Sequence, residues 1–171
     1  MTPREYFDRY VEPAYADWRA NTLSERHAKI AANEINNMAD YMLTHFTQHE
    51  PSKVYGISKP DNAGLATYRR NLCLQECQDF QTVWDIADAH KHQALFRKSA
   101  TVADTDKVSP VVSFVAGMFG AAPFGSFPFG GGGADVTALY VELLDGRKLL
   151  VSSLLDNAIT MWRRLLVASG I

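Results

Sequence analysis

The pattern of apolar residues changes near residue 98, and this change sets the class of fold that the chain can adopt. Before it, apolar residues recur with the 3.6-residue period of amphipathic helices. After it come short β-branched runs, glycines and one last helical pattern. A chain of 171 residues has the size of one ordinary domain. We therefore expect a single α+β domain over 1–171, helical over 1–98, with strands and a closing helix over 99–171.

The first part of the chain predicts three helices. Thr2-Pro3-Arg4-Glu5 combines an N-cap, a proline at the first helical position and a capping-box glutamate, and Pro13 predicts a kink or break further on. Ser24 can cap a second helix that continues to about Thr47. A third helix is expected to start at Asp61 or Asn62 and to run without interruption to about Phe96.

Apolar positions on the second and third helices predict their buried faces. On the second helix these positions are Ile35, Met38, Met42 and Phe46. On the third they are Cys73, Cys77, Phe80, Trp84 and Ala87. The two cysteines stand four residues apart on one helix face, where a disulfide is geometrically awkward, so two reduced thiols are expected.

The second part of the chain predicts a small antiparallel sheet of about four strands, over 99–103, 109–116, 136–144 and 147–151. Asp145-Gly146 is typical of a two-residue hairpin turn between the last two. A closing helix is expected to start at Ser152 or Ser153 and to end at Gly170. Its predicted buried residues are Leu155, Ala158, Ile159, Trp162 and Leu166.

Composition and charge exclude several classes of partner. The content of 47% hydrophobic and 21% charged residues is that of a folded protein. A net charge of -2 gives no overall basic character for binding nucleic acid or an anionic membrane. A local basic patch stays open, but Arg69-Arg70 and Arg163-Arg164 are isolated doublets. The uncharged run 108–134 is interrupted by prolines and glycines, and a membrane span needs about 20 continuous apolar residues. The polar start MTPREYFDRY has no signal-peptide core, so a cytoplasmic protein is expected.

The segment Trp84 to His92, WDIADAHKH, is where acid, base and possible metal ligands lie closest together. On a helix Asp85, Asp88 and His92 fall within a sector of about 60°. Asp88 and His92 could bind a divalent metal, completed by the second helix.

The residues that could complete this metal site are His45 and His49, also four apart. Alternatively, Asp85 or Asp88 could orient a histidine as a general base while Lys91 holds an anion. A purely structural interpretation stands first, however. His and Lys are favoured at a helix C-terminus by the macrodipole, and Asp88 could pair with Lys91.

The second unusual segment is the Phe/Gly-rich loop 117–134, which holds seven of the eleven glycines. Long loops are uncommon in compact domains and often carry function. Four phenylalanines are therefore candidate partner-binding residues, unless they fold back over the core or the segment is disordered, and a membrane contact is a third interpretation. These residues are Phe119, Phe124, Phe127 and Phe129.

Together these patterns favour a binding or interaction protein, with a homodimer or a protein partner as the expected assembly. No cofactor is expected. The alternative is a metal-dependent hydrolase that uses Asp85, Asp88 and His92 with His45 and His49, so whether the chain is an enzyme stays open.

Overall fold

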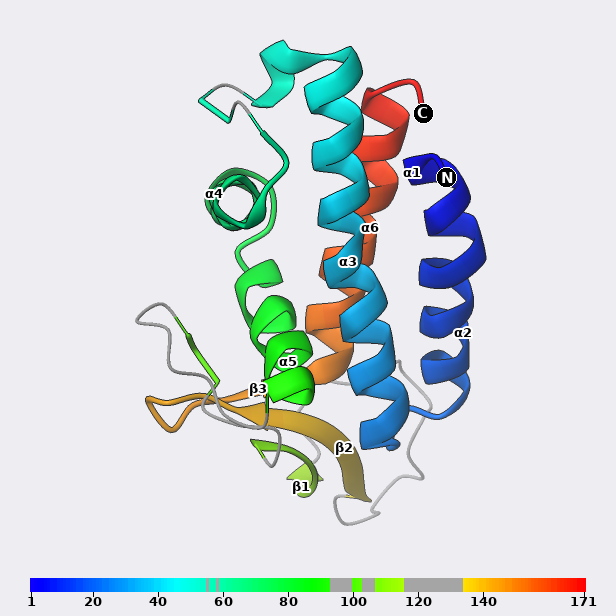
Figure 1. Cartoon of the computed structure of the whole chain (residues 1–171). Helices are drawn as coiled ribbons and strands as arrows, with labels where there is room; N and C mark the ends of the chain where they lie inside the picture. The colour runs from blue at the N-terminus through cyan, green and yellow to red at the C-terminus, as the bar shows by residue number, and fades with distance from the viewer. Residues whose placement is uncertain (55, 58, 93–99, 103–106, 116–133) are drawn as a thin grey trace.

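Helices make up most of the molecule, and a small sheet lies at one end of them (Figure 1). The computed structural model describes residues 1–54, 56–57, 59–92, 100–102, 107–115 and 134–171. The helices are α1 (Pro3–Tyr6), a π-helical segment η1 (Phe7–Val11), α2 (Glu12–Ala20), α3 (Glu25–His49), a 3-10 turn η2 (Pro51–Val54), α4 (Asn62–Gln75), α5 (Phe80–His92) and α6 (Val151–Ala168). The strands are β1 (Val108–Val115), β2 (Ala134–Glu142) and β3 (Lys148–Leu150). This confirms the predicted α+β layout with its closing helix.

Three of the predicted N-terminal caps are confirmed, and at one of them the Asp61 side chain accepts from the backbone N–H of Gly64 at the start of α4. The Thr2 side chain accepts a hydrogen bond from the Glu5 backbone, and the Glu5 carboxylate accepts one from the Thr2 backbone. The Ser24 side chain accepts from the backbone N–H of His27 at the start of α3. Pro13 neither breaks nor ends the first helix, because the π-helical segment η1 precedes it and α2 continues the same rod (Figure 1).

The prediction of one uninterrupted third helix was wrong, because α4 ends at Gln75 and α5 begins at Phe80 in a different direction (Figure 1). The backbone carbonyl of Asp79 accepts the N–H groups of Thr82 and Val83 in the first turn of α5, and its carboxylate accepts a bond from Asn157 of α6 at 2.7 Å. Arg164 of α6 donates to the backbone and the carboxylate of Glu76. The helix therefore breaks where α6 supplies partners for the freed polar groups.

The break also places the cysteines differently from the prediction of one continuous core face. Cys73 lies in α4 and Cys77 in the turn after it, and both are half-buried free thiols, as expected from their spacing. Burial raises the pKa of the Cys77 thiol above its usual value.

The sheet has three antiparallel strands in the described part of the chain, in the order β1-β2-β3, and not four. Residues 100–102, inside the first predicted strand, form none. Thr101 instead accepts the backbone N–H of Leu144 beside the last hairpin. In that hairpin the backbone N–H of Gly146 donates to the Leu143 carbonyl and closes a turn, and Gly146 itself has a φ of 84°. The turn is thus one residue longer than predicted, with glycine in the left-handed position.

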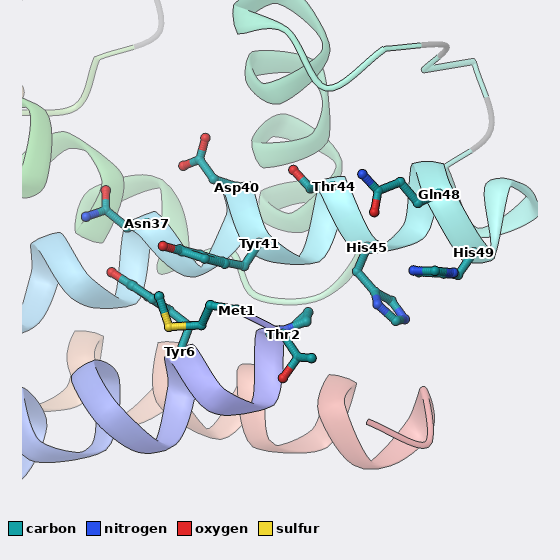
Figure 2. Close-up of a pocket in the computed structure, with 11 residues that line it drawn as sticks. Met1, Thr2, Tyr6, Asn37, Asp40, Tyr41, Thr44, His45, Gln48 and His49 are labelled. Carbon is teal, nitrogen blue, oxygen red and sulfur yellow. The ribbon is translucent and has the colours of Figure 1, made fainter.

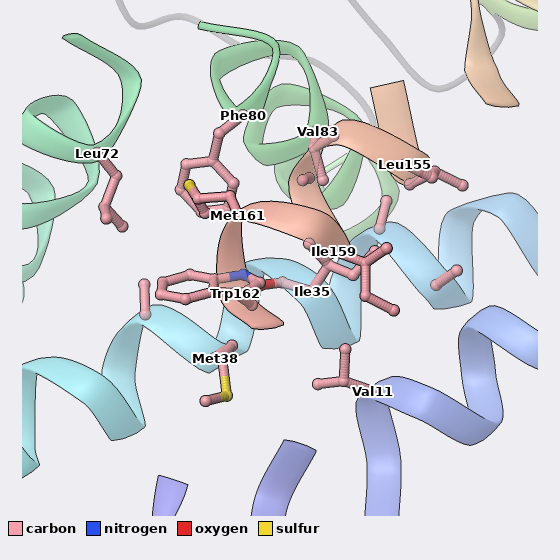
Figure 3. Packing of buried hydrophobic residues seen from close by; sticks show 14 of the residues in the cluster. Val11, Ile35, Met38, Leu72, Phe80, Val83, Leu155, Ile159, Met161 and Trp162 are labelled. Carbon is pink, nitrogen blue, oxygen red and sulfur yellow. The ribbon is translucent and has the colours of Figure 1, made fainter. Parts of the chain in front are cut away.

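The closing helix α6 fills the centre of the core, and all five of its predicted buried residues are buried (Figure 3). The Trp162 ring is completely buried and meets Phe80 of α5 edge to face, with ring centroids 5.6 Å apart. Its indole N–H donates to the backbone carbonyl of Ile35 in α3 at 2.9 Å. One side chain therefore joins α3, α5 and α6.

The ends of α6 match the prediction only in part. The helix begins at Val151, directly after β3, and Leu150 is its N-cap without a side-chain bond, so neither Ser152 nor Ser153 caps it. Gly170 has a φ of 66° just beyond the helix, as predicted for a C-terminal cap. Of the helices described, none has both the length and the apolar character that crossing a membrane requires.

Candidate functional site

Asp85, the first candidate of the acidic cluster, has a structural role. Its side chain is completely buried. One carboxylate oxygen accepts bonds from both the backbone N–H and, at 2.6 Å, the hydroxyl of Thr101, and the other accepts from Gln81 at 3.0 Å. These bonds satisfy a buried polar side chain, which would be costly without partners. Asp85 therefore ties α5 to the segment that follows it.

The other members of the cluster face different surroundings. Lys91 is exposed and its Nζ donates to the Asn37 side chain of α3 at 3.3 Å. His90 is exposed. Asp88 is half-buried, and its charge partly offsets the effect of burial, which lowers the pKa of the Arg69 guanidinium in α4. His92 is the last residue of α5, and its side chain lies outside the described part of the structure.

Arg69 is a residue that sequence reasoning passed over as part of an isolated basic doublet. Its side chain is only 12% exposed, and its guanidinium lies 3.0 Å from the Asp40 carboxylate and 5.5 Å from the centre of the Trp84 ring. Burial lowers the pKa of Arg69 and raises that of Asp40, against the mutual attraction of the pair. The sequence feature that could have indicated its burial is its position beside Tyr68 and Leu72, the buried residues of α4.

A cavity of about 630 Å³ lies between the N-terminal turn and the C-terminal half of α3 (Figure 2). Two adjacent rows of α3 form one wall, each row with a spacing of four residues. One row is Asn37, Tyr41, His45 and His49, and the other is Asp40, Thr44 and Gln48. The opposite wall consists of Met1, Thr2, Pro3 and Tyr6. Sequence reasoning identified His45 and His49 here but missed the cavity, because its second wall comes from a distant part of the chain.

Aromatic rings stand at both ends of this cavity (Figure 2). Tyr6 stacks on Tyr41 with ring centroids 4.0 Å apart and an interplanar angle of 18°. The Tyr6 hydroxyl donates a hydrogen bond to the Glu34 carboxylate. Burial, with that carboxylate, raises the pKa of Tyr6 above its usual value of 10. Further along α3 the rings of His45 and His49 lie 4.8 Å apart.

The structure brings together part of the predicted metal site. His45 and His49 share one wall of the cavity, and His45 Nε2 also lies 3.9 Å from a carboxylate oxygen of Glu50. Asp88 belongs to α5 and lies near Arg69. Within the described ranges, no three His, Cys, Asp or Glu side chains are placed so that they could hold a metal ion together. The candidate partner-binding residues Phe119, Phe124, Phe127 and Phe129 lie outside the described residues.

We predict that Asp85 and Thr101 contribute to stability as a coupled pair. Asp85→Asn should lower the free energy of unfolding by about 2 kcal/mol and Thr101→Val by about 1 kcal/mol. The double variant should lose less than the sum, by about 1 kcal/mol, because both changes remove the same bond. Urea unfolding monitored by circular dichroism measures all three. Asp79→Asn, in an exposed bond to Asn157, serves as the control. Additive losses would contradict the coupling.

A second prediction concerns Asp40. Because its pKa in the folded protein is raised above the usual 3.8, its contribution to stability is complete below the unfolded value and is lost as pH rises through the folded value. Arg69→Met removes the attraction but keeps most of the burial, so the pKa of Asp40 should rise further. The variant should therefore lose stability relative to the unmodified protein between about pH 3 and pH 7.

Carbon-detected NMR titration of the Asp40 carboxyl, with urea unfolding at both pH values, measures this effect. The matched control is Arg70→Met, since Arg70 is exposed. A lower pKa of Asp40 in the Arg69 variant would show that the guanidinium is not the group that holds it down.

The chain matches no known protein-family model, no curated protein and no solved structure.

Proposed function

We propose that this chain is a binding protein and that its binding site is the cavity between α1 and α3. The observation that carries the proposal is the cavity itself. Its volume of about 630 Å³ lies in the range of small-molecule sites, about 300–1,000 Å³. Its wall mixes aromatic rings with amide, hydroxyl and imidazole groups, which is typical of a site that orients a small organic ligand.

The roles of the acidic cluster support binding over catalysis. A catalytic carboxylate must reach its substrate, whereas Asp85 is completely buried and bonded to Thr101 and Gln81. Lys91, the candidate anion holder, is bonded to Asn37. The hydrogen bonds of Asp85 and Lys91 are thus explained by structural roles for both side chains.

Filling the cavity should abolish ligand binding without unfolding the protein. Thr44 is exposed and lines the cavity, so Thr44→Trp should occupy the space at little cost in stability. Ligand-observed NMR with a library of small fragments should detect binders to the unmodified protein, and these should lose at least about tenfold in affinity for the variant. Thr160→Trp, an exposed position on α6 outside the cavity, is the matched control. Equal binding by Thr44→Trp and the unmodified protein would move the site elsewhere.

The second candidate function is a metal-dependent hydrolase, and the close pair of His45 and His49 is the observation that favours it. In this proposal Asp88 and His92 of α5 would have to complete the coordination.

This candidate predicts that zinc or manganese raises the melting temperature of protein purified without a histidine tag, because a metal that binds only the folded state stabilises it. The shift should disappear in His45→Leu and persist in His90→Leu, whose histidine is exposed outside the cavity. The absence of any shift, together with substoichiometric metal by elemental analysis, would contradict the hydrolase.

Assembly and location also belong to the proposal. We infer a homodimer, through helices or the Phe/Gly-rich loop 117–134, or a protein partner, and we infer a cytoplasmic location from the two cysteines, which are expected to stay reduced. The assembly and the location are both inferred from the amino-acid sequence.

A further inference from the structure

We propose that the cavity between α1 and α3 takes an uncharged, planar nitrogen heterocycle, of the kind represented by a purine or pyrimidine base without phosphate. This inference rests on the proposed function and adds the chemical class of the ligand to it. It is carried by three properties of the cavity wall: a row of rings, the hydroxyl and amide groups of Thr44 and Gln48 beside it, and the distribution of charge.

The row of rings comes from helix geometry. Tyr41, His45 and His49 follow one another at intervals of four residues, so their side chains lie along one line of α3. Tyr6 packs on the Tyr41 ring at 4.0 Å and forms the end of this line (Figure 2). A flat aromatic ligand can lie against such a surface, and stacking on side-chain rings is the main contact that proteins make with nucleobases outside a duplex.

The adjacent row supplies hydrogen bonds to the edge of a heterocycle. Thr44 and Gln48 are exposed one turn apart, next to the row of rings. A hydroxyl and a primary amide can each donate and accept. A heterocycle that carries both ring nitrogen acceptors and N–H donors matches this wall, whereas a hydrocarbon of the same shape leaves these groups without partners and pays for their desolvation.

The cavity offers little positive charge to an anionic ligand. Among the described residues that line it, none is Lys or Arg, and the α-amino group of Met1 is the one primary amine. Asp40 carries a carboxylate, which is 3.0 Å from Arg69 of α4, and its side chain points away from Tyr6 (Figure 2). Phosphate groups are held in proteins by cationic side chains or by clusters of backbone N–H groups. A free base therefore fits this wall better than a nucleotide.

The test measures binding of adenine, adenosine 5′-monophosphate and cyclohexanecarboxamide to the full chain by isothermal titration calorimetry and ligand-observed NMR. The last probe keeps the amide but has no aromatic ring. We expect adenine to bind and both other probes to bind at least about tenfold more weakly. His45→Leu and Gln48→Leu should each weaken adenine binding by about tenfold, through loss of the ring and of the edge contact.

The matched control is His90→Leu, which should leave adenine binding unchanged because His90 is exposed at the end of α5. Circular dichroism confirms that each variant is folded, and Gln48 is exposed, so its variant gives an answer even if His45→Leu unfolds.

The outcomes separate this inference from the proposed function. If cyclohexanecarboxamide binds as well as adenine, and Thr44→Trp abolishes both, the cavity is a binding site but the heterocycle class is wrong. If the monophosphate binds better than adenine, the argument from charge is wrong. If neither these probes nor any library fragment binds at millimolar concentration, the inference and the proposed function fail together.

Discussion

The structure depends on one buried side chain of α6 that contacts two other helices, α3 and α5. Trp162 of α6 is completely buried, meets Phe80 of α5 edge to face, and donates its indole N–H to a backbone carbonyl of α3. Burial of the large aromatic surface is favourable in many orientations of the ring, whereas the hydrogen bond is formed in only one of them. Together they fix how far α6 can rotate and slide between its neighbours. The position of α3, and with it both the polar groups and the cavity on its outer sides, follows from this contact.

Polar groups around α3 and α5 take part in structural contacts that the sequence pattern alone did not reveal. Asp85 accepts bonds from Thr101 beyond the end of α5, and Asp40 of α3 pairs with the largely buried Arg69 of α4. Burial lowers the pKa of Arg69 and raises that of Asp40 against their mutual attraction, so the pair is weak evidence for a large contribution to stability. A cluster of charged residues in a sequence is therefore weak evidence of chemistry until its partners are known.

Local signals predicted the helices well. The capping box at Thr2, the Ser24 cap and the apolar face of α6 each involve residues within a few positions of one another, and all three are confirmed. The break between α4 and α5 was missed because its causes, Asn157 and Arg164, lie far along the chain. The cavity was missed for the same reason, since Tyr6 reaches Tyr41 only after the chain has folded back. Spacing brought out His45 and His49 as a pair, but it could not place Asp88 beside Arg69.

The π-helical segment at Phe7–Val11 determines in which direction the side chains of the N-terminal turn point around the helix axis. In it the backbone N–H of Glu12 bonds five residues back, to the Phe7 carbonyl, so the segment holds one more residue than a regular turn. Removal of that extra residue would restore an ordinary α-helix and swing everything before it by about 100° around the helix axis. Tyr6 would then face away from Tyr41. The aromatic end of the cavity thus depends on the one residue by which this segment exceeds a regular α-helical turn.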